Sequence, residues 1–301
     1  MRQTRLIMLF KDISDLPRIG AVIPTRDRKD KLFRFLDQFS QQTYPHLQII
    51  VVDSNSTDGT REDIADRFPQ VKLICVSDRE FWAGATNAGI KAALKDRCEY
   101  ILTINDDSVV KLNHVEMMLE IAQKYQVLIL GNCINYLSDP ELIWSIGTSN
   151  HWGTANFLSL NYHNVQLNHL PDSIKKSELI QVNALAGNGV LIHRQVFEAI
   201  GLYNNVFLPH YHADSEITIR ANSKGIKVFA IPSIILLNDF HVDQKHLNLR
   251  QSRGLIYAIF HKKSHLFMLP LIYIFVMYCP NSKKLATFWT LIKRFISKVK
   301  K

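Results

Sequence analysis

The sequence has few cysteines and no long apolar run, and each absence excludes a class of protein. The four cysteines are scattered and form no CxxC pair, which argues against a disulfide framework or a zinc site: Cys75, Cys98, Cys133 and Cys279. The longest apolar run, residues 266–279, is interrupted by Pro270 and is shorter than the roughly 20 residues that a helix needs to cross a bilayer. The N-terminus lacks the residue order of a secretory signal, so we expect a cytoplasmic protein.

Acidic residues are almost missing from the last fifth of the chain. From residue 241 onward there are twelve Lys or Arg and one acid, Asp243, which gives +11; the remaining 24 bases and 26 acids give residues 1–240 a charge of −2. Charge confined in this way indicates a polyanionic partner, either an anionic membrane or a nucleic acid. Apolar residues recur at helical spacing between the lysines of residues 288–299, as in a helix lying in a membrane interface. The alternative is a terminal helix docked on the core with a solvated basic face.

Apolar, β-branched runs alternate with stretches of helical period in the first half of the chain. The runs predict buried strands at residues 19–23, 47–53, 71–76, 100–104 and 127–131. This alternation predicts an α/β, Rossmann-like fold with a mostly parallel sheet flanked by helices. Residues 135–180 show no pattern that predicts regular elements. Residues 184–201 predict a turn, a short strand and a helix, and a further helix is predicted after residue 212.

Polar and acidic residues follow the predicted strands and are expected at one rim, where open parallel sheets bind ligands. The fourth strand runs directly into Asn105, Asp106 and Asp107, so two like charges are adjacent. A shared divalent cation would explain this pair, since Mg²⁺ is bound by one or two carboxylates together with phosphates. The alternative is an exposed turn with two solvated acids.

Six segments, in order, carry a resemblance to a known family. They are "IGAVIPTRDR", "IIVVDSNSTDG", "FWAGATNAGI", "INDDSVV", "AGNGVLIHRQVFEAIGLYN" and "HADSEITIRA". Over about residues 18–260 the chain resembles family 2 glycosyltransferases, inverting enzymes of the GT-A fold. The resemblance implies an N-terminal extension (residues 1–17), a GT-A domain (18–240) and a basic, apolar helical region that associates with membranes (241–301).

The resemblance implies a divalent cation, Mg²⁺ or Mn²⁺, and a set of donor-binding residues. The family's D-x-D motif aligns with Asn105, Asp106 and Asp107, and Asn105 departs from it. Asp107 is therefore the expected metal ligand. His241 is expected as a second ligand. The residues expected to bind the nucleotide sugar are Pro24, Thr25, Arg28, Asp53, Asn87, Asp106 and Arg253.

The resemblance also implies a catalytic base and acceptor contacts. Inversion needs a base that removes the proton of the attacking hydroxyl, and the alignment gives this role to Asp214. His210 and His212 are alternatives, because imidazole titrates near neutrality. Acceptor contacts are expected from Trp152, Asn188 and Glu216, and Trp144 also lies where acceptor-binding loops are expected. Asp53, Asp107 and Asp214 are then expected to border one shared hollow.

The implied function is transfer of a sugar from a UDP or dTDP donor to a saccharide, carried on a lipid, in cell-surface polysaccharide synthesis. The basic tail would hold the protein peripherally on the cytoplasmic face of a membrane, and no nucleic-acid partner is expected. One alternative is a sugar-phosphate nucleotidyltransferase, although "PTRDRKDK" lacks the glycine-rich phosphate loop of such enzymes. The other is a non-enzymatic protein that binds membrane or nucleic acid.

Overall fold

Four parallel strands form the centre of the fold. The computed structural model of the protein describes residues 16–154, 156–240 and 269–299. Within the central sheet the hydrogen-bonded order is β3-β2-β1-β4, and every neighbouring pair is parallel. The strands are β1 (Ile19–Thr25), β2 (Leu47–Asp53), β3 (Lys72–Cys75) and β4 (Tyr100–Thr103). The predicted parallel sheet is confirmed, and its carboxyl ends lie at one rim.

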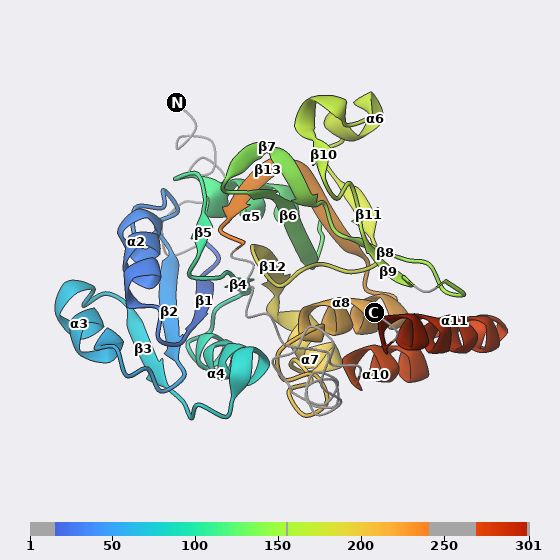
Figure 1. Ribbon diagram of the computed structural model, residues 1–301. Coiled ribbons are helices and arrows are strands. Elements are labelled where there is room, and N and C mark those ends of the chain that lie inside the picture. The colour runs from blue at the N-terminus through green and yellow to red at the C-terminus, as the bar shows by residue number, and fades with distance from the viewer. Residues whose placement is uncertain (1–15, 155, 241–268, 300–301) are drawn as a thin grey trace.

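Helices cover both faces of this sheet, as Figure 1 shows. The side chains of β1 alternate: Ala21 and Ile23 pack into one buried cluster and Val22 into the other. The first cluster is shared with α2 (Lys29–Phe39), α3 (Thr60–Arg67) and α5 (His114–Lys124), and the second with α4 (Phe81–Lys95). Gly89 lets α4 approach closely, because a Cβ there would lie 2.3 Å from Val22 Cγ1.

The second half of the chain extends the sheet with strands of mixed direction. β12 (Val190–His193) lies antiparallel between β4 and β6 (Ile129–Tyr136), and β13 (Val228–Asn238) runs parallel to β6. The remaining shorter elements are β5 (Ser108–Val109), β7 (Asp139–Ser145), β8 (Thr148–Asn150), β9 (Leu158–Leu160), β10 (Val165–Gln166), η2 (Leu167–His169), α6 (Asp172–Lys175) and β11 (Ile180–Val182). Of these, β8 and β9 pair as a separate two-stranded sheet. Most of the shorter elements have only two to four residues, too few to produce a hydrophobic period in the sequence.

Four helices gather at one end of the molecule (Figure 1). They are α7 (Arg194–Ile200), α8 (Ala213–Ser223), α10 (Leu269–Tyr278) and α11 (Asn281–Val299). The predicted helix after residue 212 is therefore present as α8. Ile274 of α10 and Leu291 of α11 belong to the same buried cluster as Ile217 of α8. None of the helices in the described ranges is both long and apolar enough to span a membrane.

Candidate active site

The rim of the sheet holds Asp106 next to the end of β1. β1 and β4 pair in parallel with Val22 opposite Thr103, so the residues that follow each pairing emerge side by side. The Thr25 hydroxyl donates a hydrogen bond of 2.7 Å to Asp106 Oδ2. Asp106 is 1% exposed, and this burial raises the pKa of its carboxyl to about 6 although Arg28 and Thr25 oppose the shift.

Arg28 neutralises the two adjacent aspartates. Its Nη1 lies 3.0 Å from Asp106 Oδ1, and its Nη2 donates a 2.6 Å hydrogen bond to Asp107 Oδ2. The planar guanidinium thus spans two carboxylates that would otherwise repel each other. In sequence Arg28 lies 79 residues from Asp107, so this pairing exists only in the folded chain.

Two adjoining hollows meet at this cluster. The first has a volume of about 220 Å³ and the second about 280 Å³. Both are bordered by five residues: Pro24, Arg28, Trp82, Asp106 and His210. Thr25, Ser54 and Asp78 line only the first hollow, which lies at the ends of β1 and β2.

Asp214 lines the second hollow. It is in the first turn of α8, where the helix dipole favours a negative charge. The backbone NH of Gly187 donates to its Oδ2 and that of Ser215 to its Oδ1, both at 2.8 Å. Gly187 permits this approach, because a Cβ there would lie 2.6 Å from Trp82 and 2.9 Å from Asp214. Two carboxylates, Asp106 and Asp214, therefore line the second hollow.

Asn188 fixes the turn that carries the aspartates. Its Oδ1 accepts hydrogen bonds from the Asn105 backbone NH at 2.9 Å and from Ser108 Oγ at 3.0 Å, and its Nδ2 donates to Asn238 at 2.7 Å. Asn188 lines the second hollow, as an acceptor-binding residue would. Its amide, however, is engaged in holding the β4–β5 turn and β13 together.

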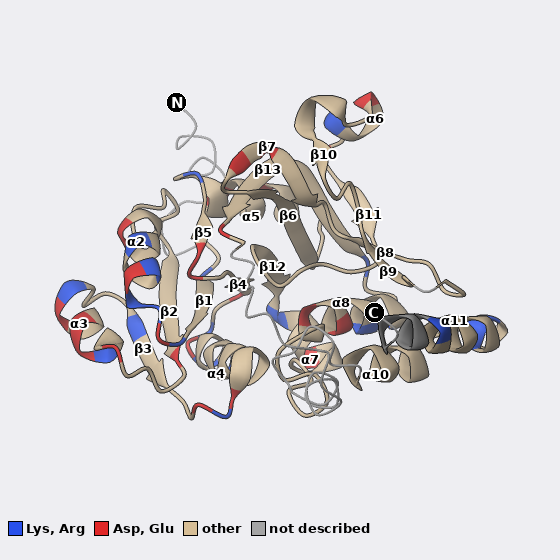
Figure 2. Cartoon of the chain, in the orientation of Figure 1, with Lys and Arg blue, Asp and Glu red and all other residues tan. Residues whose placement is uncertain are grey.

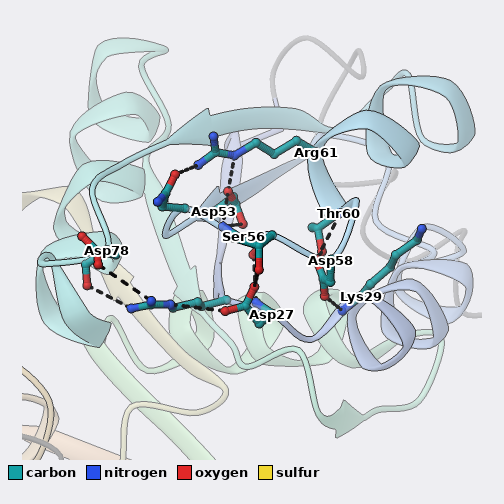
Figure 3. Close-up of polar contacts among 11 residues, drawn as sticks. Asp27, Lys29, Asp53, Ser56, Asp58, Thr60, Arg61 and Asp78 are labelled. Carbon is teal, nitrogen blue, oxygen red and sulfur yellow. Dashed lines mark hydrogen bonds and ion pairs between the residues drawn. The ribbon is translucent and has the colours of Figure 1, made fainter.

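Asp53 and Asn87 do not line either hollow. Figure 3 shows Asp53 turned toward Arg61, whose Nε donates to Asp53 at 2.5 Å, and toward Ser56. Asp53 is fully buried by these contacts. Asn87 lies in the second turn of α4 instead of at its start, and its amide bonds to both backbone groups of Tyr203. Its NH is therefore not at the free N-terminus that would favour an anion.

Trp152 and Glu216 also lie away from both hollows. The Trp152 ring stacks on Phe157 at 4.8 Å. Glu216 is 1% exposed and is held by Arg220 and by Tyr278 of α10. Trp144, stacked on Phe240 at 4.8 Å, does line the second hollow. His241 and Arg253 fall outside the described residues.

Trp82 is a site residue that the sequence reasoning did not single out. It borders both hollows, donates from Nε1 to Asn105 Oδ1 at 3.2 Å, and meets Tyr203 edge to face. The only signal in the sequence was its place in the second position of a helix that follows a strand end.

Asp107 opens onto a third hollow of about 110 Å³, which it shares with Asp106, Lys31 and Asp239. Asp53, Asp107 and Asp214 were expected to converge; in the structure they do not line one hollow, and Asp106 is the residue common to all three hollows. Asp107 instead borders the third hollow together with Lys31 of α2, and Arg61 pairs with Asp53.

The residues at the rim fit a divalent cation of the kind that is held partly by its substrate. Asp107 Oδ1 is buried and has no hydrogen-bond partner within the described residues. In the same ranges, no cluster of three or more His, Cys, Asp or Glu is placed to hold a metal ion. Mg²⁺ suits such a setting, since it commonly takes one or two carboxylates and completes its shell with phosphates and water.

Comparison with known proteins identifies the family. The model of glycosyl transferase family 2 matches residues 21–201, more than half of the chain. The chain belongs to this family. Among curated members it is 31% identical over 123 residues to the glycosyltransferase GlyG of Streptococcus pneumoniae, covering 39% of this chain and 40% of GlyG. It is 24% identical over 224 residues to the dTDP-rhamnosyl transferase RfbF of Shigella flexneri, covering 73% and 68%. The chain thus spans less than half of GlyG.

Solved structures of other proteins share the fold of this family member. GalNAc-T7, in a crystal structure with UDP, GalNAc and Mn²⁺, superposes with a TM-score of 0.60 at 18% identity, over 76% of this chain and 45% of that one. S. aureus TarS in complex with UDP-GlcNAc gives 0.53 at 12% identity, over 75% and 60%. The expected GT-A fold is confirmed.

Proposed function

We propose that this protein is an inverting glycosyltransferase that moves a sugar from a UDP or dTDP donor to a hydroxyl of a saccharide acceptor. One observation carries the proposal: two adjoining hollows share Asp106 and Arg28, and Asp214 lines only the second of them. A donor in the first hollow would reach with its sugar into the second, where Asp214 faces it.

On the donor side, Pro24, Thr25 and Ser54 border the space for base and ribose at the ends of β1 and β2. Arg28 offers a planar set of donors to the diphosphate. Asp107 would hold a Mg²⁺ or Mn²⁺, which would supply further positive charge against the departing diphosphate. Asp106, held by Thr25 and Arg28, is the carboxylate nearest to the sugar, because it borders both hollows.

On the acceptor side, Asp214 is the base. It takes the proton of the acceptor hydroxyl while that oxygen forms a bond to the anomeric carbon. The bond from this carbon to the diphosphate breaks on the opposite face, and its electron pair leaves with the diphosphate. The NH groups of Gly187 and Ser215 orient the carboxylate for this task. Trp144 offers an aromatic face to the acceptor ring.

The names of relatives support the donor and acceptor classes. RfbF is named a dTDP-rhamnosyl transferase. WfaP of Escherichia coli, 29% identical over 91 residues, is named a UDP-Glc:alpha-D-GlcNAc-diphosphoundecaprenol beta-1,3-glucosyltransferase. We extend the proposal to a lipid-linked glycan acceptor in cell-surface polysaccharide synthesis, used at the cytoplasmic face of a membrane. Family membership disfavours a nucleotidyltransferase or a nucleic-acid binder.

A thermal-shift screen of nucleotide sugars tests the donor assignment. A ligand at 100 times its Kd stabilises the native state by about 2.7 kcal/mol, which for a chain of this size raises Tm by about 5 °C. We expect this rise with a UDP or dTDP sugar in the presence of Mn²⁺, and a smaller one with EDTA. GDP and CDP sugars serve as controls. The assignment fails if all four classes leave Tm unchanged with Mn²⁺ present.

A further inference from the structure

The helices α10 and α11 form a hairpin that is docked on the protein by one face only. Figure 1 shows them side by side at one end of the molecule. On the inner face, Ile274 and Leu291 are buried in the core, and Thr287 Oγ1 accepts a 2.7 Å hydrogen bond from the Gly153 NH. The hairpin therefore has a fixed place on the domain.

The outer face of the hairpin is apolar and exposed. Of the twelve large apolar side chains exposed within the described residues, seven belong to these two helices: Leu269, Ile272, Val276, Met277, Leu285, Phe288 and Trp289. In α11, Leu285, Phe288 and Trp289 follow helical spacing and form one stripe, with Leu285 72% exposed. Apolar surface gathered in this way marks an interaction site.

The charge on the hairpin has one sign. Lys283, Lys284 and Lys293 are exposed beside the apolar stripe, and residues 269–299 contain no Asp or Glu. Figure 2 accordingly shows α10 without charged residues and α11 with blue segments and no red. An apolar face bordered by lysines matches the interface of an anionic bilayer, where acyl chains meet acidic headgroups. A surface for another protein would not require this exclusion of acids.

The exposed face continues to the loop that borders the active site. Val206 and Phe207, 73% and 53% exposed, lie between α7 and α8. The Phe207 ring stacks on Tyr273 of α10 at 5.1 Å. Three residues further along the same loop, His210 borders both hollows. The apolar face and the active site are thus neighbours on the surface.

The inner face of the hairpin is tied to the helix that carries Asp214. The Tyr278 hydroxyl donates to Glu216 Oε1 at 2.5 Å, and Glu216 Oε2 accepts from Arg220 at 3.0 Å. Arg220 in turn donates to the carbonyls of Ile200 and Leu202, at 2.6 and 2.7 Å. Because Glu216 lies two residues after Asp214, this chain of hydrogen bonds sets the orientation of the hairpin relative to Asp214.

We propose that the outer face of the α10–α11 hairpin docks on an anionic bilayer interface and presents the Asp214 side of the site to acceptors embedded in the same membrane. The docking itself rests only on the exposed face and its charge. The presentation of the acceptor rests in addition on the proposed glycosyl transfer.

Co-sedimentation of the full chain with vesicles tests the docking. We expect binding to vesicles of phosphatidylglycerol and phosphatidylcholine, weaker binding to phosphatidylcholine alone, and a further loss as salt screens the lysines. Leu285→Asp is expected to lower the partition coefficient about tenfold, since it removes an apolar contact and adds repulsion. Leu112→Asp, at another exposed leucine, is the matched control and should bind as the wild type does.

Two outcomes would overturn the docking: equal binding of Leu285→Asp and wild type, or no vesicle binding by a chain that self-associates through this face in analytical ultracentrifugation.

A transfer assay tests the presentation of membrane-embedded acceptors to the Asp214 side of the site. Leu285→Asp should raise KM about tenfold for an acceptor carried in vesicles and leave KM unchanged for a water-soluble acceptor. An equal change in KM for both acceptors contradicts the presentation of membrane-embedded acceptors. Absence of all transfer contradicts the proposed function. In that case vesicle binding alone decides the docking.

Discussion

Asp214→Asn is expected to lower the rate of sugar transfer by about 10²- to 10⁴-fold, the usual contribution of a general base. Asparagine can still accept the hydrogen bond from Gly187 or Ser215, so the first turn of α8 should persist. Donor binding should change little, because Asp214 does not line the first hollow. The measurements are kcat with a saturating donor and the donor-induced thermal shift.

Asp172→Asn serves as the control for this variant, since Asp172 is an exposed aspartate of α6 far from the site in the fold. If Asp214→Asn kept full kcat, the base would have to be sought elsewhere, and His210, which borders both hollows, would be the next residue to replace.

Asp107→Asn is expected to reduce Mn²⁺-supported transfer by at least about 100-fold. The substitution keeps the shape of the side chain and its contact with Arg28, and removes the anionic oxygen that a hard cation needs. The fold should be retained, because Asp106 still pairs with Arg28. The measurement is the transfer rate as a function of Mn²⁺ concentration.

The control for the metal effect is Asp66→Asn, at an exposed position of α3. A wild-type dependence on Mn²⁺ in Asp107→Asn would remove Asp107 from the cation site. A loss of transfer that is independent of Mn²⁺, together with a lowered Tm, would instead indicate that the Arg28 cluster mainly stabilises the rim.

The central sheet could be read from the sequence because three of its four strands, β1, β2 and β4, are buried over most of their length. Runs such as "LQIIVVD" are continuous and apolar, which is typical of parallel strands covered by helices. The region between β6 and β12 could not be read in this way. Its strands are short and partly exposed, so their pairing depends on tertiary context more than on propensity.

The site was predictable in its residue types and less so in its geometry. The strand-end position of Asp106 and the helix-start position of Asp214 follow from local patterns, and both border the second hollow. The side chains that pair with the aspartates of the rim do not follow from these local patterns. Arg28 spans Asp106 and Asp107, and Arg61 covers Asp53. Such pairings between side chains of different elements depend on how the chain packs, which spacing along the sequence does not encode.

Anomalous diffraction from crystals of the protein grown with UDP and Mn²⁺ would show most directly whether the rim acids hold a divalent cation at the donor diphosphate. We expect a manganese peak about 2.1 Å from the Asp107 carboxylate. A nucleotide bound without manganese at Asp107, or manganese bound away from the β4–β5 turn, would contradict the claim that the rim acids hold the cation.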